Sequence, residues 1–226
     1  MWKETVSVTP PYHFDKVLER LSLDPLNAVD LHARSIKVPL RTRDGKLSVI
    51  TVQAEGTAAD PVFLVSGETD REEMIERIKH IFQWEQPLQP VLDHFSKTNL
   101  SALFEEHAGT PLVLEYDVYN CLMKCIIHQQ LNLSFAFTLT ERFVHAFGEQ
   151  KDGVWCYPEP KTIAALDYQD LRELQFSMRK AEYAIDISRM IAGGALNLAE
   201  LTHLSDEDIM KKLITIRGIG PWTVQN

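Results

Sequence analysis

Two glycines flank a single aliphatic residue near the end of the chain, in the run Arg217-Gly218-Ile219-Gly220-Pro221. Because glycine has no Cβ, a ligand can approach the backbone closely at such a turn. Pro221 suits the first position of a helix, and the amides that follow it lie at the positive end of the helix dipole. The pattern predicts a phosphate-binding turn between two helices, with Ile219 packed inward. The alternative is a helix connection without a ligand, because Gly-x-Gly alone is weak evidence.

Cys121 and Cys125 are four residues apart and would share one face of a helix. Such a pair has the spacing of a metal or iron–sulfur ligand pair, but cysteines are also among the most commonly buried residues. The histidines show no ligand spacing with cysteine. We therefore interpret the pair as core residues and expect no metal site.

Asp206 and Asp208 directly follow Ser205. A carboxylate at this place could serve a hydrolytic reaction, but the spacing is that of a helix N-terminus, where Ser caps and acidic residues complement the dipole. We interpret both aspartates as capping residues.

The bulk properties are those of an ordinary globular protein, with 226 residues, 45% hydrophobic and 24% charged residues. The net charge of −9 argues against coating of nucleic acid through bulk charge, but allows local phosphate binding. The N-terminus does not resemble a signal peptide and no apolar run has membrane-spanning length. Three cysteines suggest a reducing compartment. We expect a cytoplasmic protein that does not associate with a membrane.

Residues 1–86 predict an α+β domain. Asp44-Gly45 favours a hairpin turn, and alternation of apolar residues around it indicates strands. The predicted strands are 3–9, 31–40, 47–55 and 61–65, and the predicted helices are 14–21 and 69–82, with a turn at 24–27.

Residues 87–226 predict almost only helices, after a proline-containing boundary at 83–90. The predicted helical segments are 91–95, 100–107, 117–130, 134–147, 163–167, 168–175, 178–192, 198–201 and 206–215.

Three segments of this second part, taken in order, resemble the helix-hairpin-helix DNA glycosylase superfamily, and most closely its 3-methyladenine DNA glycosylase II (AlkA-like) branch. They are Ile126–Ser134 (IIHQQLNLS), Leu174–Tyr183 (LQFSMRKAEY) and Leu213–Thr223 (LITIRGIGPWT). The resemblance covers residues 87–226. It implies an α+β fold in which a small antiparallel TBP-like (TATA-binding-protein-like) sheet domain with helices, residues 1–86, precedes an all-α glycosylase domain, residues 87–226.

The resemblance also implies which residues contact double-stranded DNA. The hairpin residues would be Arg217, Gly218, Ile219, Gly220 and Thr223. Gln129 and Gln130 would fill the gap that a flipped base leaves, Gln130 more than Gln129. The alternative is that both glutamines hydrogen-bond backbone at the bend. Ser177, Arg179 and Lys180 would contact phosphates, although Arg179 and Lys180 would also suit a solvated face and Lys180 a structural role.

Trp222 decides the type of reaction within this resemblance. Bifunctional members carry a nucleophilic lysine at this position, and an indole cannot replace it. A monofunctional hydrolase is therefore implied, with Trp222 in the base pocket, where it would stack on cationic purines such as 3-methyladenine and 7-methylguanine. Core packing beneath the hairpin is the alternative for Trp222.

The catalytic aspartate of the family lies beyond the position of Asn226, so the resemblance implies a domain that is incomplete at its C-terminus. For residues 1–226 we expect weak DNA binding and little base release. His128 and Gln175 depart from the family pattern, in which a small residue and a glycine are usual. The resemblance implies no cofactor, although hairpin carbonyls can hold a monovalent cation when DNA is bound. It also implies a monomer in the bacterial cytoplasm, associated with the nucleoid. The remaining alternatives are an 8-oxoguanine-type glycosylase, against which Trp222 argues, and a non-catalytic DNA-binding module.

Overall fold

The computed structural model describes residues 1–225, which form two compact units. The first comprises Met1–Tyr116 with Lys151–Val154, and the second comprises the rest of the described residues. The sequence placed the domain boundary at residues 86 and 87, whereas the contacts assign residues 87–116 to the first unit. The reason is that Leu88, Val113 and Tyr116 pack against the core of its sheet. The Tyr116 hydroxyl also donates to Asn27 Oδ1 at 2.9 Å.

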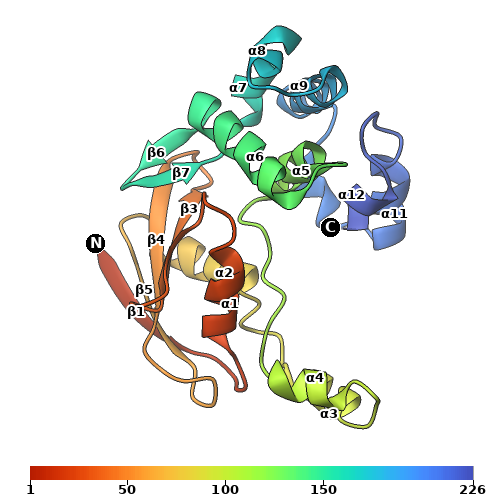
Figure 1. Ribbon diagram of the computed structural model, residues 1–226. Coiled ribbons are helices and arrows are strands. Elements are labelled where there is room, and N and C mark those ends of the chain that lie inside the picture. Colours follow the sequence, from red (N-terminus) through yellow and green to blue (C-terminus); the bar gives the residue numbers. More distant parts are fainter. Residues whose placement is uncertain (226) are drawn as a thin grey trace. The chain divides into compact units, whose positions relative to one another are not determined.

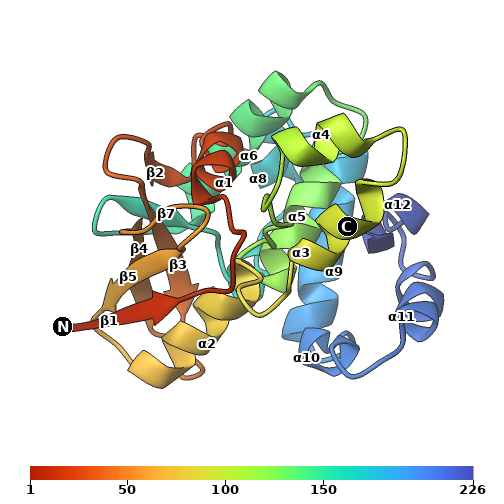
Figure 2. The ribbon, with the colours of Figure 1, turned by 90° about the horizontal axis from the view of Figure 1, so that it is seen from below.

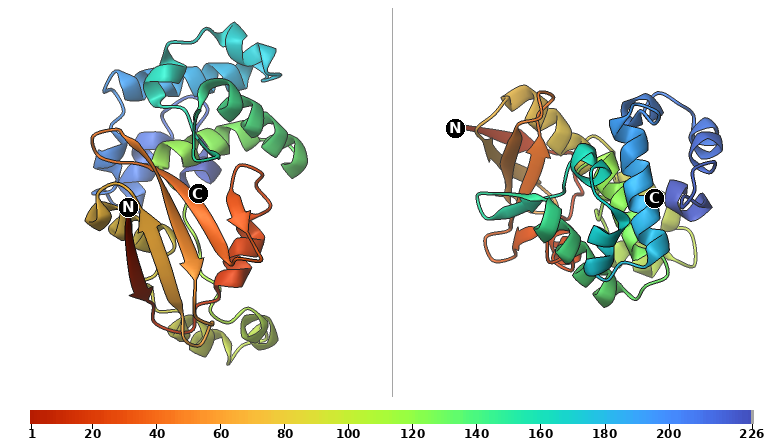
Figure 3. Two further views of the ribbon diagram at one scale, coloured as in Figure 1. Left: turned by 90° about the vertical axis from the view of Figure 1, so that its left-hand side faces the viewer. Right: turned by 90° about the horizontal axis from the view of Figure 1, so that it is seen from above.

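A five-stranded antiparallel sheet forms the body of the first unit, in the order β1-β5-β4-β3-β2 (Figure 1; Figure 3, left). Its strands are β1 (Trp2–Ser7), β2 (Ala28–Asp30), β3 (Ser35–Arg41), β4 (Leu47–Ala54) and β5 (Val62–Gly67). Alternate residues of β4 and β5 are buried, as expected when one face of a sheet packs on a core. Four of these strands were predicted, whereas β2 was missed because only three residues pair with β3.

Two helices, α1 (Phe14–Leu21) and α2 (Arg71–Ile81), cover one face of this sheet, as predicted (Figure 1). Asp70 caps α2 by accepting a hydrogen bond from the Glu73 amide at 3.1 Å. The α+β class is therefore confirmed.

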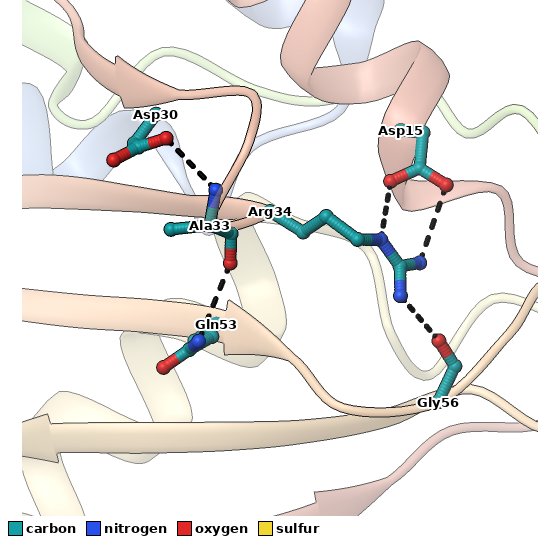
Figure 4. A network of polar contacts seen from close by, with 6 residues as sticks. All are labelled: Asp15, Asp30, Ala33, Arg34, Gln53 and Gly56. Atoms are coloured by element: carbon teal, nitrogen blue, oxygen red, sulfur yellow. Dashed lines mark hydrogen bonds and ion pairs between the residues drawn. The ribbon is translucent and has the colours of Figure 1, made fainter.

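An arginine fixes α1 to the turn after β4 (Figure 4). Arg34 donates to both carboxylate oxygens of Asp15, at 2.7 and 3.2 Å, and to the Gly56 carbonyl at 2.8 Å. Bidentate pairs of this kind add geometric specificity as well as energy. Next to it, Gln53 and Asp30 hold the β2–β3 turn through the backbone of Ala33.

The segment after α2 contains two short helices, α3 (Gln89–Phe95) and α4 (Ser101–Glu106). The rings of Phe95 and Phe104 stack with their centroids 3.7 Å apart.

Helices dominate the second unit, and α9 (Met178–Ala192) lies alongside α5 (Val118–His128) (Figure 2; Figure 3, right). The other helices are α6 (Leu133–Phe147), α7 (Pro160–Ala164), α8 (Tyr168–Glu173), α10 (Leu198–Leu201), α11 (Asp206–Leu213) and α12 (Pro221–Gln225).

A short hairpin of β6 (Glu149–Lys151) and β7 (Val154–Cys156) corrects the expectation of a purely helical second part. Its turn residues, Asp152 and Gly153, have φ of 51° and 79°. Asp-Gly is a favoured pair for such a turn, so the signal was present in the sequence and was missed.

Candidate nucleic-acid interface

The turn between α11 and α12 needs a glycine at position 218 for reasons within the protein. Gly218 has φ of 96°, and a Cβ built on it would lie 2.4 Å from Cγ of Tyr183. Ile219, the aliphatic residue between the glycines, is 5% exposed, so its predicted inward packing is confirmed. The aromatic ring of Tyr183 therefore shapes this turn from inside.

Gly220 differs from Gly218, because nothing lies within 4 Å of a Cβ built on it and its φ is not in the left-handed region. The fold alone would accept a side chain here. A glycine at this position leaves the turn open to a close approach from outside, and the binding of a phosphate there stays a prediction.

The first turn of α12 starts at Pro221, and the Val224 amide donates to the Gly220 carbonyl at 3.2 Å. The amides of Trp222 and Thr223 precede it in this turn, where a helix offers no internal acceptor. The Thr223 side chain is buried, so the predicted phosphate contact of this residue would use its backbone amide.

Trp222 is 57% exposed. This exposure disagrees with the interpretation of Trp222 as a core residue beneath the hairpin. The indole instead presents its surface beside Gly220, in the first turn of α12.

Arg217 lies against α9. Its Nη2 is 2.6 Å from Glu182 Oε2, and its guanidinium carbon is 5.4 Å from the ring centroid of Tyr183. The side chain is 66% exposed, so a DNA contact of Arg217 stays a prediction. The sequence did not single out Glu182 or Tyr183, since neither contact follows from local spacing.

The corner between α5 and α6 separates the two predicted wedge residues. Gln129 leaves the helical conformation (φ −49°, ψ 125°), and its Nε2 donates to the Gly218 carbonyl at 2.9 Å. Gln130 has φ of 56° and an exposed side chain. Gln129 thus has the backbone-binding role that was the alternative, whereas Gln130 stays the predicted wedge. Asn132 starts α6 by accepting from the Phe135 amide at 2.9 Å.

Lys180 points into this corner. Its Nζ donates to the carbonyls of Ile126, Ile127 and Gln129, at 3.2, 2.5 and 2.6 Å. An ammonium group has three N–H donors, and all three are used, so the predicted phosphate contact of Lys180 is corrected to its alternative, a structural role. Burial lowers the pKa of the Lys180 amine to about 8.

The neighbours of Lys180 keep different roles. Ser177 caps α9, because its Oγ accepts from the Lys180 amide at 3.3 Å. Arg179 is exposed at the same helix start. The phosphate contacts predicted for these two residues stay predictions.

The remaining candidates for chemistry have structural roles. Ser205 caps α11 by accepting from the Asp208 amide at 3.2 Å, and its hydroxyl donates to the Asp208 carboxylate at 2.8 Å. This confirms the capping interpretation, with Asp206 in the same first turn. Cys125 is buried, in line with a core role, and Cys121 is partly buried. Within residues 1–225 no cluster of three or more His, Cys, Asp or Glu could hold a metal ion. None of the helices in that range is both long and apolar enough to cross a bilayer.

The two departures from the family pattern have different explanations. The His128 ring lies 3.0 Å from Thr140 Oγ1 and packs edge-on against Phe137. Gln175 has φ of 73°, a conformation that glycine adopts without strain. Its side-chain oxygen accepts a hydrogen bond from Arg142.

Comparisons with known proteins agree with this geometry. Residues 123–221 match the family described as HhH-GPD superfamily base excision DNA repair protein. The chain is 77% identical over 226 residues to YfjP of Bacillus subtilis (strain 168), which bears a provisional name as a DNA-3-methyladenine glycosylase. The match covers 100% of this chain and 79% of that protein.

Two solved structures show the same fold. A 3-methyladenine DNA-glycosylase from Archaeoglobus fulgidus has a TM-score of 0.84 and 21% identity, covering 99% of this chain and 77% of the other. An 8-oxoguanine glycosylase/lyase from Clostridium acetobutylicum, in complex with double-stranded DNA, has a TM-score of 0.65 and 18% identity, with coverage of 82% and 66%.

Proposed function

The chain belongs to the HhH-GPD superfamily of base excision DNA repair proteins, and on that premise we propose that it is a monofunctional DNA glycosylase for alkylated purines. It would hydrolyse the N-glycosidic bond of bases of the 3-methyladenine and 7-methylguanine type in double-stranded DNA. The observation that carries this proposal is the exposed Trp222 in the first turn of α12. An amine nucleophile would be needed there for the strand-cleaving reaction of the bifunctional members.

An exposed indole suits a base that carries a positive charge. Stacking of a cationic purine on Trp222 gains a cation–π attraction of up to about 2 kcal/mol when water is excluded. A cationic base is also a good leaving group, so the reaction mainly needs a carboxylate that stabilises the positive charge on the sugar and orients a water molecule. The family resemblance places that aspartate after the position of Asn226, and this assignment stays a prediction.

The two turns would hold the duplex on either side of the flipped base. The hairpin offers the open backbone at Gly220 and the amides of α12 to a phosphate, whereas the exposed Gln130 fills the gap in the base stack. Carbonyl groups of the hairpin would hold a monovalent cation when DNA is bound. The protein would act as a monomer and need no other cofactor.

Binding to two duplexes tests the proposal. One contains 7-methylguanine with a 2′-fluoro sugar, which resists base release, and the other contains guanine in the same place. We expect tighter binding to the methylated duplex, and we expect Trp222→Ala to reduce this preference by about tenfold, with Trp222→Phe retaining part of it.

Equal affinity for the two duplexes would contradict a base pocket at Trp222 and favour the non-catalytic binding module. A third duplex carries 8-oxoguanine, which is uncharged, and a preference for it would instead favour the other glycosylase type, whose fold is shared. An assay of free 3-methyladenine released from methylated DNA measures the reaction itself.

A further inference from the structure

The last turn of α5 ends with carbonyl groups that no helical amide can reach. The final carbonyls of any helix lack internal donors, and a buried carbonyl without a donor destabilises the fold. Here the chain leaves the helix at Gln129 and turns into the left-handed region at Gln130. The Lys180 amine supplies the donors instead, to Ile126, Ile127 and Gln129.

Lys180 is itself held in place at the start of α9. Its amide donates to the Ser177 cap, and the residue is partly buried. A cation at a helix C-terminus also interacts favourably with the helix dipole. The amine therefore joins the start of α9 to the end of α5.

The same corner is joined to the hairpin. The side chain of Gln129 donates to the Gly218 carbonyl, while its own backbone carbonyl accepts from Lys180. On the other side, Gly218 lies against the ring of Tyr183, one helical turn after Lys180 on α9. The corner and the hairpin are thus both contacted by residues of α9.

We propose that Lys180 is a positioning residue for DNA: by holding the end of α5 it sets the place of the Gln130 wedge and, through Gln129, the place of the hairpin carbonyl at Gly218. The DNA part of this inference rests on the proposed function, because that function assigns Gln130 and the hairpin to the duplex.

The geometry favours an ammonium group over other side chains. Its three N–H bonds diverge tetrahedrally and reach three carbonyls, whereas the guanidinium of arginine is a flat, larger fork that suits two parallel acceptors. Lys180→Met keeps the length of the side chain and removes every donor. Lys180→Arg keeps the charge and changes the geometry.

Hydrogen exchange tests the inference without DNA. The Leu131 and Ile219 amides donate to His128 and Ile216, at 3.2 and 3.0 Å, and so report on the corner and the hairpin. In Lys180→Met we expect both amides to exchange about tenfold faster. The amide of His203, in the distant segment after α10, should not change. Unchanged exchange at Leu131 and Ile219 would overturn the inference.

Two variants accompany this experiment. Lys161→Met is the matched control, because this substitution removes the same charge at an exposed site. The Lys161 side chain is 76% exposed and pairs with Glu159. In this variant, exchange at Leu131 and Ile219 should equal that of the native chain. Lys180→Arg carries the test if Lys180→Met does not fold, and faster exchange of both amides is expected there too. Native exchange in Lys180→Arg would show that charge alone suffices and would overturn the geometric claim.

A double-mutant cycle tests the effect on DNA. The fluorescence of 2-aminopurine opposite or beside the target base reports unstacking. Gln130→Ala should lower the fraction of flipped base about tenfold in the native chain but less than twofold in Lys180→Met, because the wedge is already misplaced there. Equal effects of Gln130→Ala in both backgrounds would overturn the inference. If the native chain itself flips no base while the exchange result holds, the proposed function fails and the local role of Lys180 stands.

Discussion

The hairpin and the corner of the second unit each place a residue in the left-handed region, and they use opposite residue types. At the hairpin this residue is Gly218, and a Cβ there would collide with Tyr183. At the corner it is Gln130, whose long side chain is exposed although glycine would adopt its φ of 56° without strain. Packing within the protein thus requires a glycine at position 218. It does not require a glutamine at position 130, and we attribute the side chain of Gln130 to contact with DNA.

Gly218→Ala should have the largest effect. Overlap with Tyr183 and the left-handed backbone together predict a loss of about 3 kcal/mol in the free energy of unfolding, measured by urea denaturation. Gly220→Ala is the control, and its change should stay within about 0.5 kcal/mol, because a Cβ there meets nothing. Similar losses in the two variants would contradict the distinction between the glycines.

Gly220→Asp should weaken DNA binding by about 100-fold at low salt, because a carboxylate would stand where a phosphate is expected. The fold should remain, as judged by circular dichroism and urea denaturation. An affinity for DNA equal to that of the native chain would contradict the binding of a phosphate at the hairpin.

Gln130→Gly should separate stability from binding. Relief of the left-handed strain predicts a gain of about 1 kcal/mol in the free energy of unfolding, whereas binding to a duplex with a flipped base should weaken about tenfold. A gain in stability without any loss of binding would leave the exposed glutamine unexplained.

Lys180 should make the contribution of the corner to the free energy of unfolding depend on pH, whereas the contribution of the hairpin should not. The Lys180 pKa of about 8 in the folded protein lies below its ordinary value of 10.5, so the unfolded chain binds the proton more tightly. The free energy of unfolding of the native chain, relative to Lys180→Met, should therefore rise with pH between about 8 and 10.5. Urea titrations across this range measure it, and a falling difference would mean that the three carbonyls outweigh the effect of burial.

Gln175→Gly should have the smallest effect. Here too a glutamine is left-handed, but its side chain accepts a hydrogen bond from Arg142, so a gain of only about 0.5 kcal/mol in stability is expected. DNA binding should stay within about twofold of native, in contrast to Gln130→Gly. A tenfold loss would place Gln175 on the DNA-binding surface.

Local patterns carried much of the prediction. The Gly-Ile-Gly-Pro run indicated the hairpin, the buried Ile219 and the start of α12. The spacing after Ser205 indicated a helix cap. Each of these features is set by residues that are neighbours in the sequence. The structural roles of Gln129 and Lys180, which were assigned to DNA from the sequence, rest on contacts across 89 and 51–54 residues, which no local spacing encodes. Residues 87–116 were assigned by their helical pattern, although Val113 and Tyr116 pack on the distant sheet.

The position of Lys180 and Tyr183 on one helix has a geometric consequence. Lys180 contacts the corner and Tyr183 contacts the hairpin, and three residues of helix correspond to a rise of about 4.5 Å. Inserting one residue between them would rotate Tyr183 by about 100° away from Gly218 while Lys180 stayed in place. The separation of the two turns is therefore set by three residues of one helix. The loops around these turns can change only while this spacing of three residues is kept.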